Sequence, residues 1–369
     1  MIRYVLLAGA APRVRSLCLP FVACALLGLT AAAPAHAQPF DAWLHFTGDP
    51  TNGWVAVPDS GSLDISGNFT FEAWVSISNG VTGEDCRSIA GKNVLQTWWI
   101  GQCNVSGQPT LRSYLKGSGS LRNGGTIPRD VLTHVAVVFN GTQRLHYING
   151  ELAASFAESG PLPTNGAELR IGSDVSWNRT PAGFIDEVRL WNVARTTEQI
   201  RANLNVRIGA QAGLVARWTL DGTLDDAVST HDGTAQGSGL GYFHFGAGPH
   251  CTTSTAAQLC LQDRFVLTTR WRTNPVPGSV TDGLASVALS GENSGIFWFF
   301  SADNWEVMVK ALDACGLNDR YWIFSAASTN VFYRMEVFDT VGLERKIYFN
   351  YPGPPAPAVT DINAFATCP

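Results

Sequence analysis

Apolar and polar residues alternate along the first half of the chain in short runs separated by turns, which predicts β-strands. In Phe69–Val75 (FTFEAWV), every second residue is apolar and lies on one face. Asn140-Gly141 and Asn149-Gly150 each follow an apolar run, so they predict hairpins and a three-stranded antiparallel meander. Further strands are predicted at Leu169–Gly172, Phe184–Trp191 and Leu214–Leu220.

One segment, Thr196–Leu204, predicts a helix. Thr196 is followed by Glu198 and Gln199, which resembles a capping box. Ile200 and Leu204 lie four residues apart on one face, so we expect this helix to pack one side against the sheets.

Glycine is dense between residues 233 and 249, and we place a domain boundary there. The prediction is an all-β chain, with a first domain at 38–247 and a smaller β-sandwich-like domain at 248–369. The proline-rich stretch Tyr351–Pro357 should be extended, because proline fixes φ and lacks a donor. Strands of the second domain are predicted at Arg264–Trp271, Gly295–Phe300, Trp305–Leu312, Tyr321–Ser325, Phe332–Asp339 and Arg345–Phe349.

The N-terminus has the pattern of a cleaved secretory signal at residues 1–37. Arg3, Arg13 and Arg15 precede an apolar run at about Leu17–Ala33, which is followed by Ala35-His36-Ala37, a small-x-small cleavage site. The alternatives are a retained membrane helix and lipidation at Cys24. The alanine-rich signal is typical of bacteria, so we expect a secreted, extracellular bacterial protein.

Composition narrows the class of protein. Only 15% of residues are charged, 11% are aromatic and the chain has 37 glycines, which favours strands and turns over helical bundles. The net charge of −5 argues against nucleic acid as a partner. After residue 37, no apolar stretch approaches the about 20 residues of a membrane helix, so the mature form should have no membrane span.

Six cysteines follow the signal, and an even number in an exported chain favours disulfides. Many connectivities are possible, but proximity suggests Cys86–Cys103, Cys251–Cys260 and Cys315–Cys368. Zinc is improbable, because no CxxC pair occurs and no histidine stands at ligand spacing beside two cysteines.

The strand segments resemble, in order, the laminin-G-like, concanavalin A-like jelly-roll domains. The segments that carry this resemblance are FTFEAWV, THVAVVF, LHYINGEL, LRIG, FIDEVRLW and GLVARWTLDG, between about residues 40 and 245. The resemblance implies two antiparallel sheets packed face to face. Residues 251–369 resemble a C-terminal β-domain found in secreted bacterial proteins, to which no activity can be assigned.

The sequence predicts no enzyme. Glycosidases need two carboxyl groups about 5–9.5 Å apart, and the Glu-x-Asp-x-x-Glu strand motif of laminarinases is missing. Asp186-Glu187 places its acids on opposite faces of a strand. No G-x-S-x-G occurs, so Gly61-Ser62 and Gly172-Ser173 are interpreted as turns, and His134 as a packed core residue.

Calcium is the inorganic ligand that the resemblance implies, because the family often holds Ca²⁺ at a sheet edge. Asp49 and Asp186 stand at the matching acidic positions, although Pro50-Thr51 interrupts the usual pattern. The alternative is that Asp186 only accepts hydrogen bonds from loop backbone.

Tryptophans are the candidate sugar-binding residues, because their rings stack on the apolar faces of sugars. Trp177, Trp54 and Trp99 are the candidates, with Trp177 in an expected loop. Trp98 and Trp99 are adjacent on a strand, so one faces the core. Trp74, Trp191 and Trp218 are expected in the core.

The sequence is compatible with three functions. The first is a secreted, non-catalytic module that binds carbohydrate or a surface protein through its loops. The second is a structural or adhesive envelope protein, and the third is a glycoside hydrolase with an unrecognised acid pair.

Overall fold

The computed structural model describes residues 42–48, 53–78, 85–115, 121–176, 179–244, 251–273, 282–352 and 356–369. The predicted signal at residues 1–37 lies outside the described residues, as do Asp49 and Trp177. No helix in the described ranges is long and apolar enough to cross a membrane.

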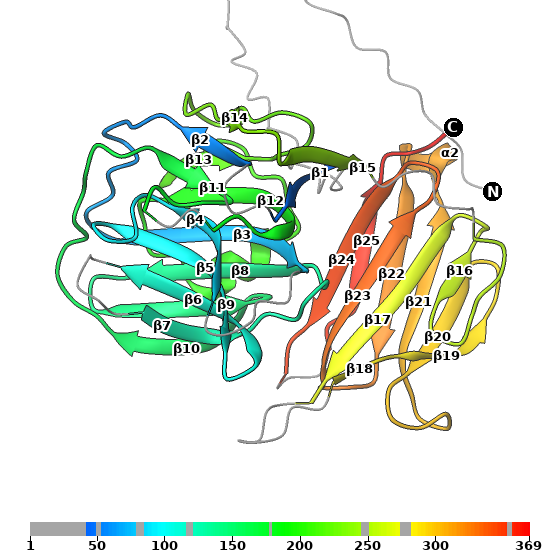
Figure 1. Ribbon diagram of the computed structural model, residues 1–369. Coiled ribbons are helices and arrows are strands. Elements are labelled where there is room, and N and C mark those ends of the chain that lie inside the picture. The colour runs from blue at the N-terminus through cyan, green and yellow to red at the C-terminus, as the bar shows by residue number, and fades with distance from the viewer. Residues whose placement is uncertain are drawn as a thin grey trace, which may run out of the picture. The chain divides into compact units, whose positions relative to one another are not determined.

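The first β-sandwich consists of two antiparallel sheets (Figure 1). The order of the first sheet is β10 (Glu151–Ala157), β9 (Gln143–Ile148), β8 (Thr133–Phe139), β3 (Phe69–Ile77), β12 (Ala182–Trp191), β1 (Ala42–Thr47) and β15 (Leu240–His244), with β13 (Leu214–Trp218) paired to β12. The order of the second sheet is β14 (Thr234–Gln236), β2 (Trp54–Val57), β11 (Leu169–Ile171), β4 (Cys86–Gly91), β5 (Trp98–Val105), β6 (Gln108–Leu115) and β7 (Leu121–Thr126).

The core of this sandwich lies between the two sheets. Phe71 and Val75 of β3 meet Ile89 of β4 and Ile100 of β5, and all four are buried. The apolar face predicted from FTFEAWV is therefore the one that packs between the two sheets, although the other face of β3 is buried as well. Each such side chain stabilises the fold by about 1.5–3 kcal/mol, so this apolar layer fixes the register of the strands.

The predicted meander is confirmed as β8–β9–β10. Asn149 and Gly150 have φ of 50° and 74°, and a two-residue type I′ hairpin needs positive φ at both positions. At the preceding turn, the Asn140 side chain accepts hydrogen bonds from the backbone of Thr142 and Gln143.

The predicted helix is α1 (Thr197–Asn203), and its capping box is present. Thr196 Oγ1 accepts from the Gln199 backbone at 3.3 Å, and the Gln199 side chain accepts from the Thr196 backbone at 2.9 Å. Ile200 and Leu204 are both buried, as their spacing predicts. Trp74 donates to the Leu204 carbonyl, which ties the helix end to the outer face of the first sheet.

The second β-sandwich, yellow to red in Figure 1, has two five-stranded sheets. One contains β16 (Leu259–Leu261), β17 (Phe265–Arg272), β23 (Phe332–Asp339) and β24 (Glu344–Asn350), with β18 (Asp282–Leu284) paired to β17. The other contains β19 (Ser286–Ser290), β20 (Ser294–Trp298), β21 (Trp305–Asp313), β22 (Tyr321–Ala327) and β25 (Val359–Phe365); α2 (Cys315–Asn318) joins β21 to β22.

All three disulfides suggested by proximity are present. Cys86–Cys103 links the paired strands β4 and β5. Cys315–Cys368 joins α2 to the C-terminal end of the chain, just after β25. This last strand was not predicted from the sequence, and it adds to the edge of the sheet beside β22.

Candidate functional site

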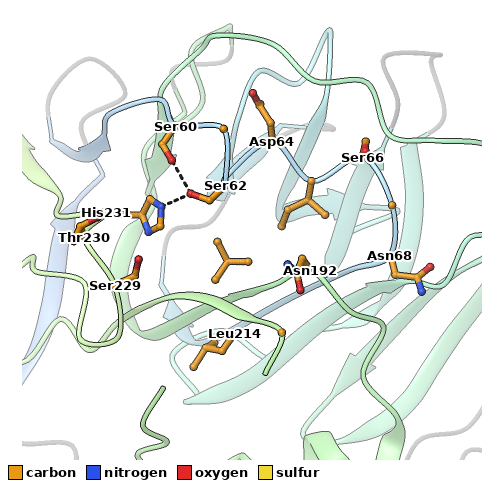
Figure 2. Close-up of a pocket in the computed structure, with 15 residues that line it drawn as sticks. Ser60, Ser62, Asp64, Ser66, Asn68, Asn192, Leu214, Ser229, Thr230 and His231 are labelled. Atoms are coloured by element: carbon orange, nitrogen blue, oxygen red, sulfur yellow. Dashed lines mark hydrogen bonds between the residues drawn. The ribbon is translucent and has the colours of Figure 1, made fainter. Parts of the chain in front are cut away.

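An open cavity of about 680 Å³ lies at one end of the first sandwich. We call it the polar pocket. It is formed by the loop between β2 and β3, the chain after β12, the start of β13 and the loop between β13 and β14 (Figure 2). Its lining residues are mostly polar: Ser60, Gly61, Ser62, Asp64, Ile65, Ser66, Gly67, Asn68, Asn192, Gly213, Leu214, Val215, Ser229, Thr230 and His231.

The pocket also has an aliphatic part. Ile65 and Val215 pack against the core of the sandwich while remaining partly exposed, and Leu214 lies beside Val215 at the start of β13. Gly213 precedes them with φ of 84°, where a Cβ would come within 2.7 Å of Val193. Glycine therefore allows the chain to turn here, next to the exposed Asn192, whose backbone N–H donates to the Gly213 carbonyl. Hydroxyl, amide and aliphatic groups thus share one surface.

Ser62, His231 and Asp226 are joined in this order by two hydrogen bonds beside this surface. Ser62 Oγ lies 2.7 Å from His231 Nε2, as Figure 2 shows, and His231 Nδ1 lies 2.9 Å from Asp226 Oδ2. A carboxylate only accepts, so in the neutral imidazole an Nδ1–H that donates to Asp226 leaves Nε2 as an acceptor for the Ser62 hydroxyl. Ser62 is exposed, whereas the Asp226 side chain is fully buried.

The backbone holds Asp226 and His231 in this arrangement. Asp226 Oδ1 accepts from the N–H groups of Arg217 and Val228, at 3.0 and 3.1 Å. The His231 carbonyl accepts from the buried indole of Trp218 at 2.7 Å. These bonds hold the Asp226 carboxylate and the backbone of His231 in place beside Ser62.

The acidic group that lines the pocket is Asp64, and a buried lysine neutralises it. Lys92 forms ion pairs with both Asp59 and Asp64, and it also donates to the Asn165 carbonyl at 2.8 Å. Asp64 is the one carboxylate among the lining residues. The polar pocket therefore lacks the pair of carboxyl groups that glycoside hydrolysis requires.

Neither Trp54 nor Trp99 lines the polar pocket. Trp54 is partly exposed on β2, and the guanidinium of Arg170 lies 4.6 Å from its ring centre. Trp99 is fully buried on β5 beside Val94 and the Cys86–Cys103 disulfide, and its indole donates to Ser88 at 2.8 Å. The interpretation of Trp99 as a sugar-stacking residue is therefore wrong, because its ring presents no face to a ligand.

The other tryptophans follow the sequence analysis. Trp98 faces the core between the sheets, and Trp74, Trp191 and Trp218 are buried. His134 is also a packed core residue, and its ring contacts that of Trp74 edge-on.

Asp186, the described half of the predicted calcium pair, lies on β12 and is almost completely buried. Neither carboxylate oxygen forms a hydrogen bond of normal geometry with a described residue. Burial, together with the nearby acids Asp221 and Glu187, raises the pKa of Asp186 well above its usual range, and Arg207 offsets this only in part. No group of three or more His, Cys, Asp or Glu side chains within the described ranges could hold a metal ion. The described surroundings of Asp186 thus favour its protonated form, and the calcium site, whose other residue Asp49 lies outside the described residues, stays a prediction.

Asp186→Asn tests the state of this carboxyl. Because the pKa of Asp186 is raised in the folded protein, the wild type loses stability as the pH rises above about 4, where the unfolded carboxyl ionises. The loss grows with rising pH until the carboxyl of the folded chain also ionises. We therefore expect the variant to melt higher than the wild type at pH 8, with the difference shrinking toward pH 4. A wild type stabilised by millimolar Ca²⁺, with a variant insensitive to it, would instead show that Asp186 holds calcium.

The residues of the polar pocket were not predicted from the sequence. Gly61-Ser62 was interpreted as a turn, which is correct for the backbone, but 169 residues separate Ser62 from His231. The available signal was the segment Asp226–His231, where an aspartate and a histidine stand five apart in a stretch rich in Ser and Thr between two strands.

Residues 49–201 match the family model described as the concanavalin A-like lectin/glucanases superfamily. This match covers five of the six segments that suggested the jelly roll and confirms the resemblance for that part of the chain, whereas GLVARWTLDG, at residues 213–222, lies beyond it. No curated protein matches the sequence.

The solved structures to which the chain is similar include three of different origin. A putative carbohydrate binding protein from Bacteroides ovatus is 21% identical, with a TM-score of 0.47, over 56% of this chain and 60% of that one. A heptameric SAP-like pentraxin from Limulus polyphemus is 15% identical, with a TM-score of 0.40, over 55% and 94%. The CBM40 of a Ruminococcus gnavus IT-sialidase, solved with α2,3-sialyllactose, is 12% identical, with a TM-score of 0.33, over 44% and 98%.

Proposed function

We propose that the chain is a secreted carbohydrate-binding module whose ligand occupies the polar pocket. The observation that carries this proposal is the mixed lining of the pocket. Asn68, Asn192 and the serine hydroxyls can exchange hydrogen bonds with sugar hydroxyls, while Ile65 and Leu214 can pack against sugar C–H groups. The match of residues 49–201 to a superfamily of lectins and glucanases supports a carbohydrate rather than another polar ligand.

Two further features support parts of this proposal. Three disulfides are typical of a protein that folds in an oxidising compartment outside the cytosol, which agrees with export. The single carboxylate among the lining residues, paired with Lys92, supports binding over glycoside hydrolysis. Calcium has no part in the proposed ligand contacts.

A glycan array with the mature chain, 38–369, tests the proposal, in buffers with Ca²⁺ and with a chelator. For a glycan that binds, we expect Asn192→Ala to weaken affinity about tenfold, the equivalent of about 1.4 kcal/mol, because a buried hydrogen bond to the ligand is lost. Gln108→Ala is the matched control, since Gln108 is exposed at the β5–β6 turn outside the pocket.

Each of the other outcomes contradicts a different part of the proposal. Binding that survives Asn192→Ala but not Trp177→Ala would move the site to the loop predicted from the sequence. Loss of binding in the chelator would give calcium a role in the site. A blank array in both buffers would favour a structural or adhesive envelope protein, or one that binds a surface protein.

A further inference from the structure

The Ser62–His231–Asp226 chain has the arrangement of an activated serine nucleophile. The nucleophile-to-base and base-to-carboxylate distances, 2.7 and 2.9 Å, are both normal hydrogen bonds. The carboxylate is buried and the imidazole nearly so, while the serine is exposed in the wall of a cavity. These are the geometric roles by which such a triad is recognised on unrelated folds, whatever the order of its residues along the chain.

A fourth group, Ser60, sets the direction of the hydrogen bonds. Ser60 Oγ lies 2.7 Å from Ser62 Oγ. Since the Ser62 hydroxyl donates to His231 Nε2, the Ser60 hydroxyl is the donor to Ser62 Oγ. Ser62 Oγ is thereby held between one donor and one base, with its remaining lone pair available to an electrophile in the pocket. The turn at residues 61–63 is anchored to the core of the sandwich, because Leu63 is buried there and its N–H donates to the Ser60 carbonyl.

We propose that Ser62 is a catalytic nucleophile and that the polar pocket cleaves acyl esters. Ser62 Oγ forms a bond to the acyl carbonyl carbon while its proton passes to His231 Nε2. The C–O bond to the alcohol then breaks, and the leaving oxygen takes that proton from Nε2. Water repeats the sequence on the acyl-enzyme, which releases a carboxylic acid and restores the Ser62 hydroxyl. Asp226 is a positioning residue that holds the tautomer and stabilises the imidazolium.

The identity of the alcohol rests on the proposed function. A pocket whose walls carry hydroxyl and amide groups fits a polyhydroxylic leaving group, so the substrate class is a carbohydrate that bears an O-acyl group. The nucleophile does not depend on this, because a small activated ester needs no sugar contacts. This proposal departs from the expectation, drawn from the sequence, that the chain is no enzyme.

The test uses the mature full chain with two small probes. A fluorophosphonate labels an activated serine covalently, and peptide mapping locates the label; p-nitrophenyl acetate measures hydrolysis. We expect the label on Ser62, and we expect Ser62→Ala to abolish it and to reduce hydrolysis at least about 100-fold. Ser290→Ala is the matched control, because Ser290 is an exposed serine on β19 of the second sandwich.

His231 and Asp226 give independent readouts. His231→Gln should lose both labelling and hydrolysis while the melting temperature reports intact folding. Asp226→Asn should shift the pH profile of hydrolysis, because the asparagine no longer fixes the Nδ1–H tautomer. Since Asp226 also binds loop backbone, its variant is interpreted only if the melting temperature shows a folded protein.

The outcomes separate this inference from the proposed function. A wild-type chain that binds glycans but neither takes the label nor hydrolyses the ester overturns the nucleophile and leaves the binding module. Labelling of Ser62 with a blank glycan array supports the nucleophile and overturns the carbohydrate leaving group. A label on Ser60, or one unaffected by His231→Gln, would show that the hydrogen bonds among Ser62, His231 and Asp226 only hold the two loops together.

Discussion

Glu72→Ala is expected to lower the free energy of unfolding by about 3–5 kcal/mol, because it leaves a buried arginine without its partner. Glu72 lies on β3, fully buried on the outer face of the first sheet. Arg195 Nη1 is 2.8 Å from one of its carboxylate oxygens, and His134 Nε2 is 3.3 Å from the other. Arg195 also donates to the Gln199 carbonyl, so the cluster connects the sheet to α1.

The pKa of Glu72 explains why the carboxylate stays ionised. Burial alone would raise it, but the contact with His134 and the charges of Arg189 and Arg195 lower it to about 2. Burial in turn lowers the pKa of His134, which is neutral at pH 7, so the arginines supply the positive charge. The stability that this low pKa provides is fully present above pH 4.5 and is lost as the pH falls toward 2.

Urea unfolding of matched variants measures this effect. Glu72→Gln should lose less than Glu72→Ala, because the amide oxygen still accepts a hydrogen bond. The double variant Glu72→Leu with Arg195→Met should also lose less, since it leaves no unpaired charge on either partner. Glu292→Ala, at an exposed position, is the control. An unchanged unfolding midpoint in Glu72→Ala would show that the cluster contributes nothing to stability.

The strands that could be predicted have both a strict alternation and a turn that ends them. FTFEAWV became β3 because its apolar face packs between the sheets, and the two Asn-Gly turns set the pairing of β8, β9 and β10. The disulfides could be suggested because each joins cysteines that are near in sequence or at the end of the chain.

The remaining features depend on contacts between distant segments. Alternation places Trp99 on the face of β5 that points away from the core between the sheets. Only the packing of Val94 and the disulfide against Trp99 shows that this outer face is also covered. The bulge at Asp186–Arg189 leaves Glu187 with φ of 48° and bonded to Arg217, an irregularity that a period of two cannot reveal. Ser62 meets His231 because the β2–β3 and β13–β14 loops lie at the same end of the sandwich.

The second large effect that we expect is a loss of stability below pH 6.5, caused by the buried His146 on β9. Its ring is fully buried, and Nε2 lies 2.7 Å from Ser113 Oγ. Nδ1 has no hydrogen-bond partner among the described residues, and a Cβ on Gly124 would come within 2.5 Å of the ring. Burial, with a smaller contribution from the charge of Arg144, lowers the pKa of His146 to about 3.

Because this pKa is lowered on folding, the unfolded chain binds a proton that the folded chain excludes. The stability that His146 provides is therefore present above pH 6.5 and falls by about 1.4 kcal/mol for each pH unit below it, or about 3 kcal/mol between pH 6.5 and 4. We expect His146→Gln to melt at a lower temperature than the wild type at pH 7.5, because a flexible amide does not fill the packed space of the imidazole ring, but to lose less stability on acidification. Melting curves from pH 7.5 to 4 measure the difference in slope, which also removes the contributions of groups common to both proteins. Parallel curves would mean that His146 takes up its proton without unfolding the sandwich, and that water reaches Nδ1.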